Sequence, residues 1–330
     1  MNEVEDWAAR RGDFEGHRFF RTSGSGGVEK WVALSNEALE WSARKVVEAL
    51  GIGKSDVLGL ALPENHVGGY GMVVRAEVSG ARLARFGERW EVARFVSWTR
   101  SEGVTVLSLV PTQVHDLVKA EVRGNEALRV VVVGGGALDE GLKEEARSLG
   151  WPVVPSYGMT ETGSQVATGD GLPLLPGWEA KVVEGRLALR GGGLLTALIR
   201  RGDDDFWAED PKEDGWFLTN DRVELEGASL RFLGRADRVV KVLGELVNLE
   251  ALEGIWKEKL GVEVAVVDLP EERKGAGLYL FYEGEERDLD KGNRAMPGLE
   301  RLSGWQRLDR LPRTALGKID RLSLKKFHQV

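Results

Sequence analysis

The sequence predicts an α/β protein in which a parallel sheet flanked by helices is followed by a small β subdomain and then by a C-terminal α+β domain. From Ser35 to about Ala180, short apolar runs alternate with longer amphipathic segments, as in parallel strands joined by helices. The run Val130–Val133 is β-branched throughout, which is typical of a strand buried on both faces. After Ala180, short β-like segments between Gly- and Asp-rich turns indicate antiparallel sheet.

The first helix of the α/β part is expected to begin after Ser35, a good N-cap residue, and to end at Gly51. Its apolar residues recur every three or four positions and therefore share one face. A later helix is expected to open at Pro111, because proline suits the first helical turn. The other predicted elements are strand Val57–Leu62, helix Val67–Ser79, helix Glu88–Arg100, strand Val104–Val110, strand Val130–Val133, helix Asp139–Leu149 and strand Val153–Pro155.

The pattern changes twice after Ala180. The β subdomain is predicted to contain Arg186–Arg190, Thr196–Arg200, Trp216–Thr219 and Ser229–Leu233. From about Arg235 the predicted order is strand Val239–Val242, helix Asn248–Leu260, strands Val262–Asp268 and Leu278–Glu283, and a basic tail. We therefore expect one domain at residues 1–234, with its β subdomain at about 181–234, and a second domain at 235–330.

Composition excludes several classes of function. The 330 residues carry a formal net charge of −8, so the chain has no basic surplus with which to neutralise nucleic-acid phosphates. It contains no cysteine, which excludes disulfides, thiolate nucleophiles and zinc sites built from cysteine. The charged start, MNEVEDWAARRGDFEG, argues against a signal peptide, and no stretch is long and apolar enough to span a membrane. We expect a soluble, cytoplasmic protein; the sequence leaves homo-oligomerisation open.

A glycine-rich segment near the start suits an anion. It runs Thr22-Ser23-Gly24-Ser25-Gly26-Gly27-Val28-Glu29-Lys30. Glycines let backbone N–H groups approach a phosphate, hydroxyls donate to its oxygens, and a lysine supplies the countercharge. The segment is not a P-loop of the GxxxxGK[ST] kind, because Glu29 stands where the second glycine must be and Trp31 follows the lysine. The alternative is a Gly/Ser hairpin tip.

A second candidate site lies where two predicted parallel strands end. Gly134–Gly136 follow one strand and the loop Ser156–Thr162 follows the next, so both fall on the edge of the sheet where ligands bind. Glu161 in that loop could hold Mg²⁺, a hard cation that prefers oxygen ligands. The alternatives are a tight turn for the glycines and a solvated carboxylate for Glu161.

Two further motifs stand in the C-terminal half. Asp221, which ends Gly215–Asp221, suits a pair of ribose hydroxyls, and Arg235 in Gly234–Asp237 could reach ribose or phosphate. Leu311–Arg321 places Lys318 behind a glycine. Taken singly, these residues could be turn residues, surface ion pairs and a basic tail.

Order and co-occurrence favour the functional interpretation. The motifs resemble those of the adenylate-forming superfamily of acyl-CoA synthetases, luciferases and peptide-synthetase adenylation domains, over about residue 18 to the end. Each family motif is matched by one segment of this chain: the glycine-rich signature by Thr22–Lys30, YGxTE by Tyr157–Glu161, GWxxTGD by Gly215–Asp221, GRxD by Gly234–Asp237, and PRTxxGKxxR by Pro312–Arg321.

Within that superfamily the chain is similar to the o-succinylbenzoate–CoA ligases of menaquinone biosynthesis. The stretches that carry this resemblance are Leu62–Gly69 with Arg75, Ser108–Gln113 and Gly158–Gln165. Family members usually carry well over a hundred residues before the glycine-rich segment, and here about 20 precede it, so we expect an adenylate-forming fold that lacks most of the usual N-terminal subdomain. A compact natural form is expected, with a truncated chain as the alternative.

The resemblance implies ATP, Mg²⁺ and coenzyme A as co-substrates and an acyl-AMP intermediate. It implies catalytic roles for Lys318, Glu161 and Thr160, with Glu161 on Mg²⁺. It further implies that ATP is bound by Thr22, Ser23, Gly24, Ser25, Lys30, Gly134, Gly135, Gly136, Ser156, Tyr157, Asp221 and Arg235, and that the acid, a small-molecule carboxylate, is contacted by His66, Arg75, Ser108 and Thr112.

The resemblance also implies a mobile C-terminal domain. Asp237 is the implied hinge, about which this domain rotates between the two half-reactions, and Gly244 and Glu245 are the implied coenzyme A channel. Two alternatives stay open: an acyl- or aryl-CoA ligase of other specificity, and a non-catalytic relative that binds a nucleotide or an acyl group.

Overall fold

The computed structural model of this chain describes residues 3–23, 29–202, 205–271, 275–314 and 317–327. The chain divides into two compact units, Met1–Thr219 with Glu224–Arg231, and Asn220–Val223 with Phe232–Val330. The division falls inside two neighbouring strands, β14 (Trp216–Glu226) and β15 (Ser229–Arg235), and not in a linker.

The larger unit is built around a six-stranded sheet with the order β4-β3-β5-β6-β7-β8. The first five strands run parallel and β8 is antiparallel to β7. The strands are β3 (Val57–Leu60), β4 (Arg82–Arg85), β5 (Val106–Leu109), β6 (Val130–Val133), β7 (Val153–Met159) and β8 (Ser164–Thr168). The predicted α/β class is therefore confirmed; β4 was not predicted.

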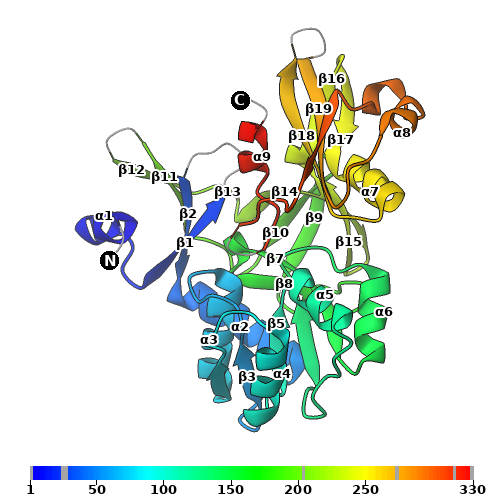
Figure 1. Cartoon of the computed structure of the whole chain (residues 1–330). Coiled ribbons are helices and arrows are strands. Elements are labelled where there is room, and N and C mark those ends of the chain that lie inside the picture. Colours follow the sequence, from blue (N-terminus) through cyan, green and yellow to red (C-terminus); the bar gives the residue numbers. More distant parts are fainter. Residues whose placement is uncertain (1–2, 24–28, 203–204, 272–274, 315–316, 328–330) are drawn as a thin grey trace. The chain divides into compact units, whose positions relative to one another are not determined.

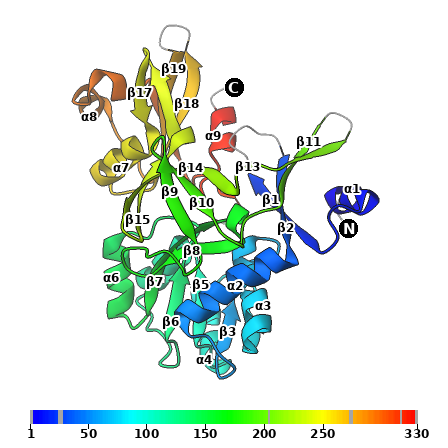
Figure 2. The same ribbon diagram turned by 180° about the vertical axis from the view of Figure 1, so that it is seen from behind.

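Helices cover both faces of this sheet, as Figures 1 and 2 show from opposite sides. In strand β6, Val131 and Val133 pack against α4, α5 and α6, while Val130 and Val132 pack against α2 and α3. This explains why the whole run is β-branched and apolar. The helices are α2 (Asn36–Leu50), α3 (Val67–Ser79), α4 (Val92–Ser101), α5 (Pro111–Lys119) and α6 (Glu140–Ser148).

Helix ends follow local signals where these are strong. The Ser35 hydroxyl accepts a hydrogen bond from the Ala38 amide at 3.1 Å, and Gly51 takes the left-handed conformation with φ 59°. The helix expected from Glu88 begins instead at Val92, because residues 86–90 form the connection from the unpredicted strand β4.

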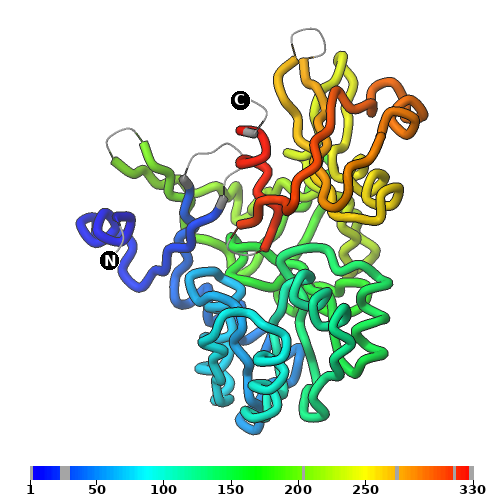
Figure 3. The backbone as a smooth tube through the Cα atoms, in the orientation of Figure 1, coloured from blue at the N-terminus to red at the C-terminus, as the bar shows by residue number. Residues whose placement is uncertain are grey.

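A second sheet of the larger unit joins segments that lie far apart in the sequence. It has the order β1-β2-β11-β12, and Ala33 of β2 pairs with Ala197 of β11. In Figure 3 the blue hairpin β1–β2 and the green hairpin β11–β12 lie side by side. Helix α1 packs on this sheet through Val4 and Trp7. The elements are α1 (Glu3–Arg11), β1 (His17–Ser23), β2 (Glu29–Ser35), β11 (Ala197–Arg201) and β12 (Phe206–Glu209).

A third sheet contains β9 (Glu179–Val183), β10 (Arg186–Arg190), β13 (Lys212–Glu213) and the strands β14 and β15. Its order is β13-β14-β10-β9, with β15 paired to β14. The antiparallel pattern predicted after Ala180 is therefore present, but it is shared between two sheets, one of which includes the N-terminal hairpin.

The smaller unit is an α+β unit. Its three-stranded sheet has β19 (Gly275–Glu283) between β18 (Val264–Glu271) and β20 (Gly304–Leu308), and β16 (Val239–Val242) and β17 (Glu245–Asn248) form a hairpin. Apolar clusters lie on both faces of the three-stranded sheet. The helices are α7 (Leu249–Leu260), α8 (Asp290–Arg294) and α9 (Arg321–Phe327), with the short helical turns η2 (Ala236–Arg238) and η3 (Gly298–Glu300).

Within the residues that the structure describes, no helix combines the length and the apolar character needed to cross a membrane.

Candidate active site

The predicted adenine-site residues Ser156 and Tyr157 lie within strand β7 and not in a loop after it. Ser156 and Tyr157 were expected in a loop after a strand ending at Pro155, and this expectation is wrong. The strand continues to Met159, because at Pro155 it changes partner: residues 153–155 pair with β6, and residues 156–159 pair with β8. An irregularity between Tyr157 and Gly158 bends the strand, as a bulge does. The loop proper is the short turn η1 (Thr160–Thr162).

The glycine triplet after β6 lies directly beside β7. The Ser156 hydroxyl donates to the Val133 carbonyl at 3.1 Å, and the Gly134 amide donates to the Leu109 carbonyl at 3.1 Å. A Cβ on Gly134 would stand 2.8 Å from the Ser156 hydroxyl, so a larger residue there would displace that hydroxyl. Gly135 adopts φ 78°, the left-handed region that favours glycine. Close packing therefore favours glycine at position 134, and backbone conformation favours it at position 135.

Lys30 and Glu161 meet although 131 residues separate them. The Lys30 ammonium lies 3.1 Å from a Glu161 carboxylate oxygen, and the two side chains are only 21% and 15% exposed. Lys30 lies on β2 opposite Thr22 of β1, and the Thr22 hydroxyl donates to the Lys30 carbonyl at 3.5 Å. The glycine-rich hairpin and the η1 turn thus present one cation and one carboxylate at a common point.

Other predicted phosphate-binding residues are only partly placed. Ser23 ends β1 and pairs in register with Glu29 of β2. Gly24 and Ser25 lie outside the described residues. Thr160 precedes Glu161 in η1 and is half-buried.

Glu161 suits a Mg²⁺ ion whose other ligands are substrate phosphates and water. No group of three or more metal-ligating acidic or histidine side chains occurs in the part of the chain that the structure describes. Mg²⁺ is commonly bound by one or two carboxylates, with substrate phosphates and water completing its coordination. A single half-buried carboxylate beside a lysine matches that donor set and does not match a metal held by protein ligands alone.

Arg75 on α3 is a buried cation. Its side chain is 2% exposed; its Nη2 donates to the Ser164 hydroxyl at 2.6 Å and its Nη1 to the Met72 sulfur at 3.3 Å. Among the described residues no acidic side chain pairs with it, and its Nε makes no hydrogen bond. Burial lowers the pKa of Arg75 to about 10, so the guanidinium stays charged at neutral pH. A buried charge of this kind is costly unless an anion joins it.

Ser164, the partner of Arg75, was not predicted as a site residue. It opens β8 directly after the η1 turn and has φ 140°. A Cβ on Gly71 of α3 would lie 3.3 Å from the Arg75 guanidinium and 3.4 Å from the Ser164 hydroxyl. The sequence could have pointed to Ser164, because this residue belongs to the stretch Gly158–Gln165 that carries the family resemblance.

The remaining predicted acyl-site residues lie near the carboxyl ends of the strands. Ser108 is buried near the end of β5, Thr112 is exposed in the first turn of α5, and His66 stands at the start of α3. Arg75 makes no hydrogen bond with any of these three residues in the described part of the chain, so their shared role stays a prediction.

In the smaller unit, the predicted ribose and hinge residues form one ion-pair group. The Arg235 guanidinium donates to Asp237 through two nitrogens at 2.8 and 2.7 Å and to the buried Asp221 at 3.1 Å. The hydrogen bond with Asp237 is the main cause that raises the pKa of Arg235 above its usual value. Burial alone would raise the pKa of Asp237, but Arg235 lowers it overall.

Lys318 is exposed in a tight reversal of the chain before α9. The Thr314 amide donates to the Lys318 carbonyl at 2.7 Å, and the Asp320 amide donates to the Pro312 carbonyl at 2.7 Å. Gly317 allows the reversal with φ 74°. We refer to residues 312–314 and 317–320 as the lysine loop.

Gly244 and Glu245 lie at the tip of the β16–β17 hairpin. Leu243 and Gly244 have φ 52° and 89°, and such a pair of positive φ values is the conformation of a two-residue hairpin turn. Leu243 and Leu246 are exposed on this hairpin.

A scan against protein-family models matches residues 20–188 to the family described as AMP-binding enzyme. The 2-succinylbenzoate–CoA ligase of Escherichia coli is 30% identical over 318 residues, which cover 93% of this chain and 68% of that protein.

Solved structures give the same result. A variant of Escherichia coli MenE with bound OSB-AMS is 28% identical with a TM-score of 0.78, covering 94% of this chain and 68% of that one. Bacillus subtilis MenE in complex with ATP and magnesium ion is 25% identical with a TM-score of 0.79, covering 93% and 69%. This chain therefore spans about two thirds of the length of these proteins.

Proposed function

This chain belongs to the AMP-binding enzyme family, and we propose that it is an ATP-dependent acid–CoA ligase that forms an acyl-AMP intermediate. Its proposed acid is 2-succinylbenzoate, the acid in the name of its Escherichia coli relative, and coenzyme A is the proposed thiol. The predicted family and fold are confirmed by the comparisons. The observation that carries the proposed reaction is the contact between Lys30 and Glu161.

That contact supports a site for a magnesium nucleotide. Lys30 would meet the terminal phosphates together with Thr22, Ser23 and Ser25, and Glu161 would hold Mg²⁺, which would offset the charge of the phosphates.

The choice of acid rests on Arg75. A dicarboxylic aromatic acid carries one carboxylate that reacts and one that must be recognised. Arg75 supplies a buried guanidinium whose observed partners, Ser164 and Met72, are both neutral. Guanidinium and carboxylate form strong charge-assisted hydrogen bonds, so the second carboxylate of the acid suits this position.

The chemistry requires a cation between two anions. The reacting carboxylate must approach the α-phosphate, and like charges about 4 Å apart interact by roughly 4 kcal/mol at an effective dielectric constant of 20, against about 1 kcal/mol in water. We assign the offsetting ammonium to Lys318. Asp221 and Arg235 would hold the ribose, and Gly244 and Glu245 would line the path of coenzyme A in the second half-reaction.

The proposal is tested by pyrophosphate release from Mg·ATP with a panel of carboxylic acids. We expect 2-succinylbenzoate to give the highest kcat/KM. A different acid as the best substrate would leave the reaction standing and overturn the assigned acid. No release with any acid would favour a non-catalytic relative that binds a nucleotide or an acyl group.

A further inference from the structure

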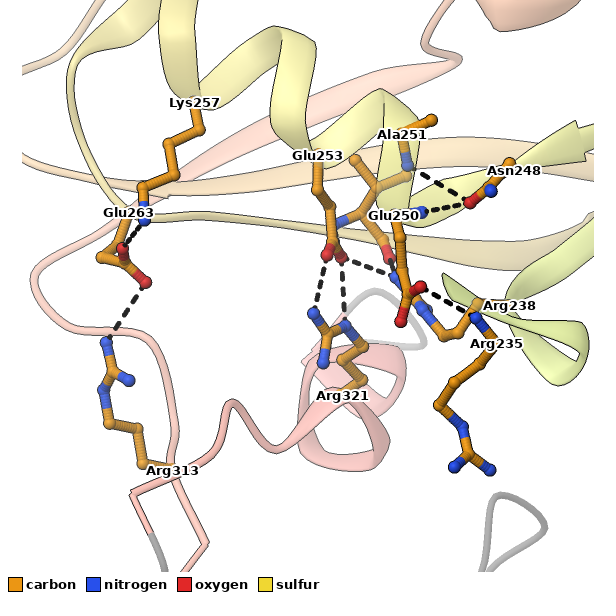
Figure 4. A network of polar contacts seen from close by, with 11 residues as sticks. Arg235, Arg238, Asn248, Glu250, Ala251, Glu253, Lys257, Glu263, Arg313 and Arg321 are labelled. Atoms are coloured by element: carbon orange, nitrogen blue, oxygen red, sulfur yellow. Dashed lines mark hydrogen bonds and ion pairs between the residues drawn. The ribbon is translucent and has the colours of Figure 1, made fainter. Parts of the chain in front are cut away.

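Four hydrogen bonds converge on one carboxylate of the smaller unit. Glu253 on α7 accepts from Arg321 through Nε at 3.0 Å and Nη2 at 2.7 Å, from Arg238 Nη2 at 2.6 Å, and from the Val266 amide at 2.8 Å. Figure 4 shows both guanidinium groups pointing to this side chain. The Glu253 side chain is 13% exposed and that of Arg238 is 14% exposed, so solvent compensates little for a lost contact.

The two arginines come from the two segments that matter most for the proposed reaction. Arg238 directly follows Asp237, the predicted hinge, and closes the η2 turn. Arg321 directly follows the lysine loop and opens α9. Glu253 therefore joins the hinge segment to the segment that carries Lys318.

Arg238 has few acceptors other than the Glu253 carboxylate. Arg238 also donates to the Val266 carbonyl at 3.0 Å, but its Nε is buried and makes no hydrogen bond within the described residues. Burial lowers the pKa of Arg238, which is the effect expected when a charge is removed from water. Removing one partner of such a buried group leaves the others uncompensated.

The lysine loop has further contacts: Ile319 packs against the apolar cluster that contains Ala265 and Leu324, and Arg313 forms ion pairs that are longer than those of Glu253. Arg313 at its start lies 3.7 Å from Glu263 and 4.0 Å from Glu283, and these carboxylates are 39% and 28% exposed. Exposed pairs of this kind contribute little. Asp320 at the end of the loop caps α9, because its carboxylate accepts from the Ser323 amide at 3.2 Å and from the Ser323 hydroxyl at 2.7 Å.

We infer that Glu253 is a positioning residue for Lys318: through Arg321 and Arg238 it holds the lysine loop and the hinge segment as one rigid piece. When the unit rotates about the hinge, Lys318 then moves together with the hinge segment. This inference rests on the proposed function, because it gives Lys318 a task in acyl-adenylate formation. It adds a residue that touches neither the nucleotide nor the acid.

The first test is a double-mutant cycle on the rate of acyl-adenylate formation. Glu253→Gln keeps the shape of the side chain and removes its charge, and we expect a loss of about 10²-fold, the cost of displacing a reacting group by about 1 Å. In a Lys318→Ala background the same substitution should change the residual rate by less than about twofold, because it acts through the absent ammonium. Arg321→Lys, which keeps the charge and loses the two-nitrogen contact, should behave in the same way.

The second test needs no substrate. In Glu253→Gln, hydrogen exchange at the amides of Thr314, Gly317 and Asp320 should be faster by about tenfold, the effect of losing one hydrogen bond to a charged group. Asp268→Asn is the matched control, because it removes the 2.9 Å ion pair between Lys325 of α9 and β18 and leaves Glu253 intact. It should leave both the adenylation rate and these amides unchanged.

The outcomes separate this inference from the function on which it rests. An equal loss in the wild-type and Lys318→Ala backgrounds, or unchanged exchange in the lysine loop, would overturn the role of Glu253 and leave the proposed function standing. A wild-type protein that forms no acyl-adenylate from any acid would overturn both.

Discussion

At the scale of single residues, the proposed reaction depends on two cations with opposite surroundings. Arg75 is buried against neutral partners, whereas Lys318 is exposed on a tight loop. A buried, fixed guanidinium suits recognition, because it pays no ordering cost when its ligand arrives. An exposed ammonium on a loop suits a charge that must enter and leave a site between two half-reactions.

Lys318→Ala should lower acyl-adenylate formation by about 10²–10³-fold, as the loss of one transition-state donor does. Thioester formation from supplied acyl-adenylate should survive, because no second anion then approaches the phosphate. Single-turnover assays of each half-reaction measure the two effects. An equal loss in both would contradict the assigned role.

Arg75→Ala should raise KM for 2-succinylbenzoate far more than KM for a monocarboxylic benzoate, because only the first acid brings a second carboxylate. The expected change in the ratio is about tenfold or more, the value of a hydrogen bond to a charged group. Arg75→Lys is the control, since it keeps the charge and loses the planar geometry. A ratio that Arg75→Ala leaves unchanged would remove the carboxylate contact.

At the scale of elements, one carboxylate ties together the amino ends of three parallel strands. Asp56 precedes β3 and accepts from Arg129, which precedes β6, through two nitrogens at 2.8 Å each. It also accepts from the hydroxyl of Thr105, which precedes β5, at 2.8 Å. This cluster lies at the edge of the sheet opposite the candidate site, so it affects folding and not chemistry.

Asp56→Asn should lower the free energy of unfolding by about 2 kcal/mol at neutral pH, the value of a hydrogen bond to a charged group. The hydrogen bond from Arg129 lowers the pKa of Asp56 well below its usual value. A carboxylate with a lowered folded-state pKa stabilises the protein above its unfolded pKa of about 3.9, and this stabilisation is lost as the pH falls below it. Urea unfolding at several pH values should show the difference between the two proteins shrinking below about pH 4. A difference that does not depend on pH would exclude this mechanism.

Elements with strong local signals were predicted well. Helix α3 and strand β6 have the predicted bounds, because Gly80 ends the helix in the left-handed conformation and a β-branched run specifies a buried strand. Strand β7 was predicted too short, because its second half pairs with β8, a strand that periodicity did not reveal. The hairpin β1–β2 was noted only for its glycines, and its pairing with β11 depends on segments too distant for any local pattern.

The candidate site shows the same limit. The motifs identified Lys30, Glu161 and Arg75, but no spacing rule could place Lys30 against Glu161 or show that Arg75 is buried. Ser164 and Glu253 were missed because each acts through a partner that only the fold brings to it.

At the scale of the whole molecule, the proposed reaction requires two chemistries from one chain. The two units are joined through β14 and β15, and Asp237 stands two residues after β15 ends. Hinges are commonly a few residues at the ends of elements that absorb a change in φ and ψ. We therefore propose that rotation about Asp237 exchanges the lysine loop for the Gly244–Glu245 turn.

Asp237→Pro should separate the half-reactions, because proline fixes φ at about −65° and favours one orientation of the C-terminal unit. We expect one half-reaction to fall by at least about tenfold more than the other in single-turnover assays. Asp237→Ala is the control, because it also loses the ion pair with Arg235 but keeps backbone freedom. Parallel losses in the proline variant would contradict a hinge at this residue.

The most direct measurement is chemical identification of the product formed from Mg·ATP and 2-succinylbenzoate when coenzyme A is left out. We expect a tightly bound acyl-adenylate with one equivalent of pyrophosphate, and its conversion to thioester and AMP once coenzyme A is added. Recovery of unreacted acid and ATP, under conditions in which the protein is folded, would contradict the proposed function.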